Sequence, residues 1–449
     1  MQKRLIPLCF ITGATLLAND VFAQSFSSLD PRSMAMGGTG VAVSRPDTAT
    51  FFNPSLLSLP REDDDFALQL PYFGVKAFDP NDFDDNLDKT QDAIDALEAT
   101  INTIDGLALS SYTSTHFNNL SQDTDDVNNA LNDMDQDLLY FEVGIGIAGG
   151  MPSEKLGIGA FVHGRMAGSG LLNYNDSEAL SDLAEDATTI AACIDVPASC
   201  TATAGDLNII TITGSIDNPV TVSVNYVPED DLESTADVRA AAITEAGVSF
   251  AHNYQGFAIG VTPKYVRVDT FDYQATAESA DTDDIDGDDY LESYSDFNLD
   301  IGIAKEVKEN LIVGFVIKNL IEQDYETVQK DLLTDDEYRD RGGDITLSPQ
   351  ARVGIAYQTN WGVVAADLDL TKNNALGFEE EHQQLAIGAE FDALGFLQLR
   401  AGYKSDFEDS DRSTASAGLG LSFLSAHFDF AIAGNGDEIG AALELGFAF

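Results

Sequence analysis

The sequence predicts an all-β protein, a fourteen-stranded antiparallel β-barrel of the outer-membrane type with an N-terminal plug and long extracellular loops. Three observations lead to this fold class. Segments of about ten residues alternate between apolar and small or polar residues. The connections between these segments are alternately short and long. The last segment, residues 438–449, shows the same alternation and ends in Phe449, as the last strand of an outer-membrane barrel does.

The candidate strands follow one another along the chain with few interruptions. An even strand count, with both ends of the barrel on the short-turn side, is the topology of outer-membrane barrels. A soluble β-sandwich, the alternative for an all-β chain, would not separate short from long connections in this way. The strands are expected at residues 65–78, 138–149, 156–162, 242–253, 257–268, 294–305, 311–320, 349–359, 362–370, 383–391, 396–404, 414–424, 426–433 and 438–449.

The N-terminus has the organisation of a signal peptide. Lys3 and Arg4 form a positive region, residues 5–17 form an apolar core, and residues 21–23 (VFA) offer a cleavage site before Gln24. An uncleaved membrane anchor is the alternative, but it needs about 20 apolar residues in a row. The sequence therefore predicts a signal peptide over residues 1–23 and an exported protein.

The charge balance excludes one class of partner. The formal net charge is −53, and a chain this acidic repels nucleic acid. A uniformly acidic surface suited to a salty habitat and an outer face that binds cations both remain open. The acids gather outside the alternating segments, at residues 82–88, 123–137, 281–289, 335–344 and 406–411.

Two long loops carry patterns of their own. Apolar residues at helical spacing within the first, residues 79–137, predict an amphipathic helical hairpin. The second, residues 171–241, contains a candidate hairpin at residues 207–213 and 220–227. It also contains Cys193 and Cys200, which an exported protein is expected to join in a small disulfide-closed loop. Lid, receptor surface and simple packing all remain open as roles for these loops.

One acidic loop resembles a calcium-binding loop in part. Asp284, Asp286 and Asp288 place carboxylates at alternate positions around Gly287, as a calcium loop does. The pattern departs at both ends, where Thr282 and Ser293 replace the expected acids. A Ca²⁺ site and a plain acidic loop therefore both remain open, and no other cofactor is expected.

The predicted strands place charged residues on the face opposite the apolar one. Lipid should contact the apolar face, so these charged residues should face the lumen, where opposite charges can pair. A paired network that only fills the barrel and a path for a substrate are both compatible with this set. The lumen-facing candidates are Glu142, His163, Arg165, Asp300, Arg352, Asp367, Asp369, Arg400, Lys404, His427, Asp429 and Glu444.

The segment between the signal peptide and the first strand, residues 24–60, is predicted to fold into the lumen as a hatch. Gly37, Gly38 and Gly40 permit close approach of the backbone and unusual dihedral angles. Asn53 and Pro54 form an N-cap and first helical position. The remaining residues, 61–449, would then form the barrel.

These motifs resemble a known family. MGGTGVA (residues 36–42) and FNPSLL (52–57) resemble the hatch of the FadL-like outer-membrane proteins, with Ser55 in place of the family's Ala. Later segments resemble the branch described as conjugal transfer TraF-like, which is related to the PorV type. They are KNL (318–320), LSPQARVG (347–354), DLDLT (367–371) and LRAGY (399–403).

The resemblance implies two functions. FadL-like barrels suggest a passive channel for small molecules, hydrophobic ones included, in which Asn53 and Pro54 anchor the hatch. The TraF-like and PorV-like branches imply an accessory role in conjugation or surface secretion instead. Expected partners are outer-membrane lipid, the barrel assembly machinery through Phe449, a small hydrophobic ligand, and a conjugation or secretion partner. No Ser–His or His-x-x-x-His motif of a catalytic site is recognised, so the sequence predicts no enzyme.

Overall fold

A computed structural model describes residues 29–59, 65–107, 111–276, 290–327, 344–373 and 376–448. The predicted signal peptide, the candidate calcium loop with Asp284, Asp286 and Asp288, and Phe449 lie outside the described residues. No described helix is both long enough and apolar enough to cross a membrane.

Fourteen strands form one closed antiparallel barrel, which confirms the predicted fold class. Strands β1 and β18 pair with each other and so close the sheet. The strands are β1 (Ala67–Phe78), β2 (Leu138–Met151), β3 (Gly157–Asn173), β6 (Thr235–Tyr254), β7 (Phe257–Thr276), β8 (Leu291–Lys308), β9 (Leu311–Lys318), β12 (Gln350–Thr359), β13 (Gly362–Asp369), β14 (Gln384–Asp392), β15 (Leu397–Asp406), β16 (Thr414–Phe423), β17 (Ala426–Gly434) and β18 (Glu438–Ala448).

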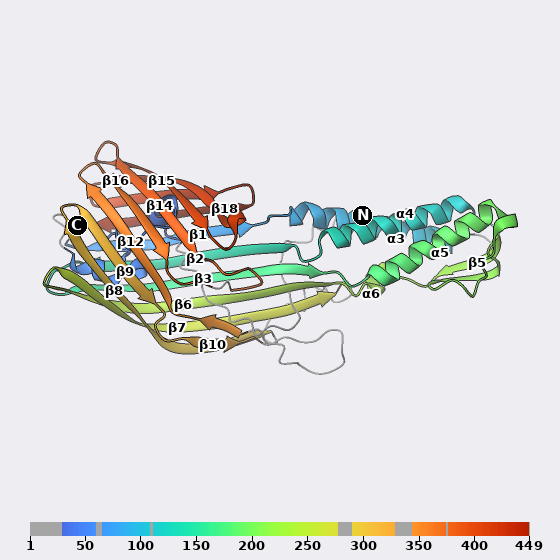
Figure 1. Cartoon of the computed structure of the whole chain (residues 1–449), viewed down its shortest axis with the longest axis horizontal. Helices are drawn as coiled ribbons and strands as arrows, with labels where there is room; N and C mark the ends of the chain where they lie inside the picture. Colours follow the sequence, from blue (N-terminus) through green and yellow to red (C-terminus); the bar gives the residue numbers. More distant parts are fainter. Residues whose placement is uncertain are drawn as a thin grey trace.

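The barrel wall is taller on one side than on the other (Figure 1). Strands β6 and β7 have 20 residues each, whereas β9 and β13 have 8. The predicted strands at residues 242–253 and 257–268 are too short at the long-loop end, where β6 begins at Thr235 and β7 ends at Thr276. The extra residues of β6 are buried on both faces, Val238 as well as Asp237 and Arg239, so they show no apolar-polar alternation.

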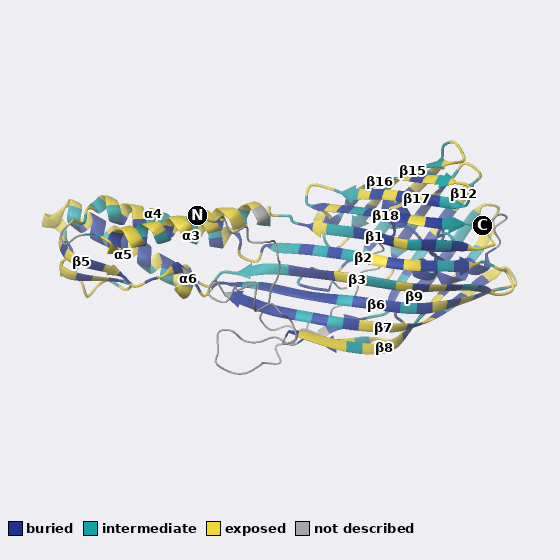
Figure 2. Cartoon of the chain, turned by 180° about the vertical axis from the view of Figure 1, so that it is seen from behind, coloured by how far each residue is buried: buried dark blue, intermediate teal, exposed yellow. Residues whose placement is uncertain are grey.

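The two faces of the wall have opposite chemistry. Buried and exposed residues alternate along the strands (Figure 2), and large apolar side chains make up much of the exposed set. Ile145 in β2, for example, is 53% exposed, while Glu142, on the other face of the same strand, is 1% exposed. An apolar outer face around a polar interior is the arrangement of a barrel embedded in lipid.

A separate unit projects beyond the long-loop end of the barrel (Figure 1). We call residues 83–232 outside the barrel strands the projecting domain. It has its own apolar core, to which Leu97, Phe117 and Ile190 belong. The helical pattern was recognised in the first loop but missed in the second, where α5 is rich in alanine. Its elements are α3 (Phe83–Asp105), α4 (Ser114–Asp133), α5 (Ser177–Asp195), η2 (Pro197–Ser199), β4 (Ile210–Ser215), β5 (Asn218–Val224) and α6 (Pro228–Asp231).

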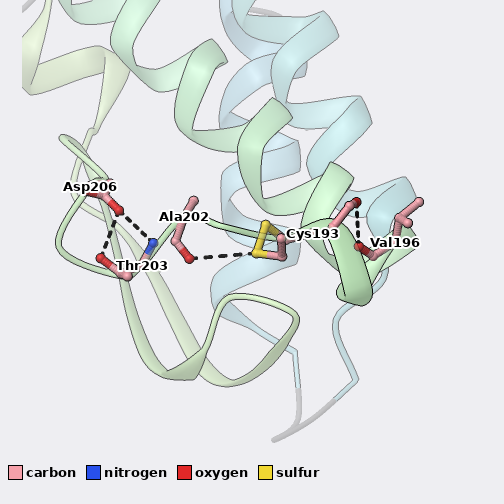
Figure 3. Close-up of a disulfide and its surroundings, with 7 residues drawn as sticks. Cys193, Val196, Ala202, Thr203 and Asp206 are labelled. Carbon is pink, nitrogen blue, oxygen red and sulfur yellow. Dashed lines mark hydrogen bonds between the residues drawn. A yellow bond between two sulfur atoms is a disulfide. The ribbon is translucent and has the colours of Figure 1, made fainter.

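A disulfide joins Cys193 and Cys200 in this domain, as predicted (Figure 3). The bridge connects the last turn of α5 to the segment after η2, and the Cys200 sulfur lies 3.7 Å from the carbonyl oxygen of Ala202. The two cysteines are 7 residues apart, so the loop that they close is short and local.

Replacing both cysteines with serine should therefore affect only the projecting domain. We expect a loss of about 2 kcal/mol in its local stability, because a short closed loop restricts the unfolded chain only modestly. Hydrogen exchange should become faster across residues 177–232 and stay unchanged in the barrel strands. Loss of barrel assembly in this variant would show that the bridge has a wider role.

Candidate functional site

Residues 29–59, which we call the hatch, form three short helical elements. They are α1 (Pro31–Ala35), α2 (Ala49–Phe52) and η1 (Pro54–Ser58). Asp30 caps α1 through a hydrogen bond from the Ser33 amide, and Pro31 occupies the first turn. Nearly every hatch residue is buried, although the segment has no sheet partner. The barrel wall must therefore supply the surface that covers it.

The hatch crosses the bore from one wall to the opposite one. Near α1, the Gly37 amide donates to Ser416 of β16. At the other end, the Leu57 carbonyl accepts from the amide of Ser153, in the short turn between β2 and β3. Strands β15–β17 and strands β3, β6 and β7 lie on opposite sides of the fourteen-strand order. The bore is therefore obstructed near its short-turn end.

Glycines on the inner face of the wall make room for the hatch. A Cβ atom on Gly402 would lie 2.1 Å from the Gly37 nitrogen, and one on Gly302 would lie 1.9 Å from Asn53 Oδ1. Such approaches are impossible for any other residue without displacement of the hatch. We call this set the glycine belt: Gly74, Gly144, Gly260, Gly302, Gly314, Gly354, Gly388, Gly402 and Gly418.

The five hatch residues singled out by the sequence all have specific contacts. Gly37 and Gly38 have φ of 71° and 96°, in the left-handed region that favours glycine. Gly40 leaves no room for a side chain, since a Cβ there would lie 2.1 Å from the Phe52 ring. Asn53 donates to the Val41 carbonyl at 2.9 Å and accepts from the Ser55 amide, and Pro54 begins η1.

Charged groups tie the hatch to the wall. Arg32 forms a two-point contact with Glu390 of β14, at 2.8 and 2.9 Å. The Asp367 carboxylate of β13 accepts from the backbone amides of Gly40 and Val41, at 2.7 and 2.9 Å. Such polar contacts hold the hatch in one position, yet water can replace them when the hatch moves.

A second hatch arginine contacts the wall on β17 and β18. Arg45 lies 2.9 Å from Asp429 and 2.5 Å from Glu444. Arg400 of β15 joins Asp429 at 2.5 Å and Glu390 at 2.6 Å, so that it links the carboxylates held by the two hatch arginines. The hatch contacts thus form one connected network.

Further toward the long-loop end, charges of both signs are paired within the wall. Arg165 contacts Glu142 at 2.8 Å. Lys264 lies 2.9 Å from both Glu245 and Asp300. Burying such charges is costly unless opposite charges meet, and here they do. The pairing accounts for the polar interior without a substrate, so a substrate path remains a prediction.

The other predicted lumen residues lie in the same interior. Arg352 pairs with Asp369 and reaches the Gly38 carbonyl of the hatch at 3.3 Å. Lys404 contacts Glu438 at 3.0 Å. The His163 ring is hydrogen-bonded to the Tyr72 hydroxyl. The structure thus brings most of the predicted set into contact with the hatch or with one another.

The described part of the loop between β13 and β14, residues 370–373 and 376–383, folds inward over the other end of the bore. We call it the mouth loop. The Phe378 amide donates to the Ser169 hydroxyl of β3 at 2.6 Å. Strand β3 lies across the barrel from β13 and β14. Leu376 is 1% exposed and joins an apolar cluster with residues of β6 and β7. The loop therefore spans the mouth, above the hatch.

Ionic contacts hold the mouth loop on its own side. Glu379 contacts Arg412 at 2.5 Å. His382 lies 3.0 Å from Asp406 and 3.8 Å from Glu379. Burial lowers the pKa of His382, but the hydrogen bond to Asp406 and the nearby Glu379 carboxylate outweigh that effect and leave its pKa above the usual value.

The mouth loop should therefore loosen as pH rises. Because the folded-state pKa of His382 is raised, its contribution to stability is fully present below about pH 6.5 and is lost as pH rises through the folded pKa. We expect hydrogen-exchange protection of residues 376–383, corrected for intrinsic rates, to fall as pH rises above about 6.5 and through the folded pKa of His382. In a His382→Gln variant, which keeps a donor but does not titrate, protection should not change with pH.

Sequence reasoning predicted some of the residues that connect the hatch to the wall, such as Asp367, and missed others. It singled out hatch glycines but not Arg32 and Arg45, although two arginines in an otherwise small and apolar segment were a usable signal. Glu390, at an inward position of β14, was also missed. The inward fold of the mouth loop leaves no pattern in sequence, because it depends on contacts with β3 and β6.

Comparison with known proteins identifies the family. Residues 50–369 match the family model described as "F plasmid transfer operon, TraF, protein". The chain belongs to this TraF family. The match begins within α2 of the hatch and ends with β13, so it includes the whole projecting domain but neither the hatch arginines nor strands β14–β18. No curated protein sequence matches the chain.

Solved barrels of similar fold are distant in sequence. The toluene transporter TbuX of Ralstonia pickettii is 12% identical, with 93% of this TraF-family chain and 98% of that chain covered and a TM-score of 0.49. The toluene transporter TodX of Pseudomonas putida is 12% identical, with 96% of this chain and 99% of that chain covered and a TM-score of 0.45. The CymD monoaromatic hydrocarbon channel is 13% identical, with 93% of this chain and 97% of that chain covered and a TM-score of 0.33. At these values the likeness says nothing about cargo.

Proposed function

We propose that this protein is a gated passive transport protein of the bacterial outer membrane, in which the hatch is the gate. The observation that carries the proposal is the way the hatch obstructs the bore. It is held by hydrogen bonds and ion pairs, such as those of Arg32 and Asp367, which can be exchanged for water. A barrel that needed only a filled interior could use an apolar core, which is at least as stable as buried ion pairs.

The mouth loop supports the same proposal. Together with the hatch it obstructs the bore at two levels, and a polar interior lies between them, with Glu142 and Lys264 among its residues. A solute would have to displace both segments in turn. Such an arrangement limits leakage while it permits passage on binding.

The cargo class is proposed to be small molecules, hydrophobic ones included. Beside the hatch, the Phe51 ring lies 5.3 Å from Phe161 and 6.0 Å from Tyr72, between ring centroids. These rings form an apolar patch between the hatch and the wall, and hatch movement would expose it. Aromatic edges and faces are suited to bind a small apolar solute.

A reversible crosslink between hatch and wall tests the gate. The Cβ of Leu29 lies 3.3 Å from the position of a Cβ on Gly144, close to the separation in a disulfide. In proteoliposomes, a Leu29→Cys/Gly144→Cys variant should take up a monoaromatic solute only after reduction. Each single-cysteine variant should be indifferent to the reductant. Equal uptake before and after reduction would contradict a hatch that moves at this end.

The projecting domain favours a second candidate, an accessory role at the cell surface in conjugation or secretion. A unit with its own core and disulfide, placed beyond the mouth, is more than a gate requires. Native mass spectrometry of protein extracted gently from its membrane separates the two candidates. A retained small hydrophobic molecule supports transport, whereas a retained protein partner with an empty bore supports the accessory role.

A further inference from the structure

Three side chains with metal-ligating groups converge at the short-turn end of the barrel. They are His427 and Asp429 of β17 and Glu444 of β18, and one ligand atom from each lies within 4.8 Å of the others. All three residues are buried. An imidazole nitrogen together with carboxylate oxygens is a ligand set that divalent first-row metals accept.

The Arg45 guanidinium of the hatch occupies the point where these groups meet. Its Nη2 atom lies 2.5 Å from Glu444, 2.9 Å from Asp429 and 3.1 Å from His427 Nε2. That nitrogen carries only two hydrogens, so it cannot donate to all three groups at once. A metal ion has no such limit, since it contacts every ligand within its coordination shell.

A fourth group, the carboxylate of Asp47, is directed at the same point: one oxygen accepts from the Thr48 amide and the other lacks a hydrogen-bond partner in the described part of the chain. Asp47 of the hatch is 0% exposed, and its Oδ2 atom accepts no hydrogen bond among the described residues. That oxygen lies 3.7 Å from His427 Nε2. A buried carboxylate oxygen with no donor is costly, and a bound cation would remove the cost.

The charge balance around this point also favours an additional cation. Among the described residues, acids outnumber the bases that pair with them by one, and uncompensated buried charge is unfavourable. The Arg45 side chain is 23% exposed, so solvent reaches one side of the cluster. The acids are Asp47, Glu390, Asp429 and Glu444, and the bases are Arg32, Arg45 and Arg400.

We propose that His427, Asp429, Glu444 and Asp47 form a divalent-cation site, and that Arg45 occupies its cation position when the hatch is seated. A divalent cation and the Arg45 guanidinium then compete for the same ligands. The proposal does not depend on what passes through the bore.

Manganese binding to the full-length protein in detergent tests the site. Excess Ca²⁺ should be present to saturate the acidic loops. We expect an Arg45→Ala variant to bind Mn²⁺ at one site about tenfold more tightly than the wild type, because the competing cation is gone. Pulsed EPR should detect nitrogen coupling from a histidine ligand. Adding Glu444→Gln to this variant should weaken binding about tenfold or more.

An Arg32→Ala variant is the matched control. It removes the same charge from the hatch, but its partner Glu390 has no histidine among the contacts described here. It should raise Mn²⁺ affinity much less than Arg45→Ala does, because Arg45 itself still competes for the ligands. Equal affinity in the Arg45→Ala and Arg32→Ala variants would overturn the proposal.

A measurement without Arg45→Ala covers the case in which that variant does not assemble. At high Mn²⁺ concentration the wild type should itself show nitrogen coupling, as Mn²⁺ displaces Arg45. A His427→Gln variant should lose this coupling and keep the signal from the acidic loops. Absence of nitrogen coupling in the wild type at saturating Mn²⁺, or its persistence in His427→Gln, would overturn the proposal.

Discussion

Deletion of residues 24–59 should convert the obstructed barrel into a conducting one. The deletion removes every element that crosses the bore near the short-turn end, from α1 to η1. It also leaves Glu390, Asp429 and Glu444 without their hatch arginines, so water should enter to solvate them. In planar bilayers we expect steady stepwise current in place of the wild type's near-zero baseline.

The mouth loop determines how large this effect is. If it stays closed, the deletion variant should show brief rather than steady openings, and a second deletion across residues 374–381 should make them steady. The altered mobility of a folded barrel on unheated gels provides the assembly control. If a folded deletion variant has the same conductance as the wild type, the hatch is not the gate.

The barrel was predictable from the sequence because lipid imposes a simple rule on it. Each strand must present apolar side chains outward, and the small or charged residues between them must then face inward. The pattern is clear in β18, where Leu443 and Leu445 are exposed on either side of the buried Glu444. It fails in the outer third of β6, where both faces are covered.

The hatch contacts were predictable only in part. The glycines and the Asn53–Pro54 pair carry local signals, because backbone angle and helix capping are properties of neighbouring residues. Arg32 and Glu390, in contrast, are 358 residues apart, and their pairing depends on which wall strand faces α1. Strand periodicity gives the face of a residue but not its partner across the bore.

The glycine belt shows that inward strand positions also mark where the hatch packs against the wall. A glycine at an inward position of a strand looks like a missing side chain, since it neither fills the bore nor faces lipid. In β14 and β15, Gly388 and Gly402 face each other and both lie against the backbone of residues 36–37. These glycines therefore mark the wall positions that the hatch backbone contacts, which composition alone does not reveal.

Replacement of Gly402 with valine should therefore unseat the hatch without harming the wall. The new Cβ would lie 2.1 Å from the Gly37 nitrogen, a backbone atom that cannot rotate away. Overpacking of this kind costs about 1–3 kcal/mol even where side chains can adjust, and here they cannot. We expect the variant to conduct as the hatch deletion does, with normal barrel assembly.

Two comparisons make this prediction specific to the hatch. Ala401→Val changes the preceding residue of the same strand, which is exposed on the lipid side, and should leave conductance unchanged. Gly302→Val meets the Asn53 side chain at 1.9 Å, and that side chain can turn aside at the loss of its hydrogen bond to Val41. Its leak should therefore be smaller than that of Gly402→Val. Equal leaks in all three variants would mean that strand packing, rather than the fit of the hatch, keeps the bore closed.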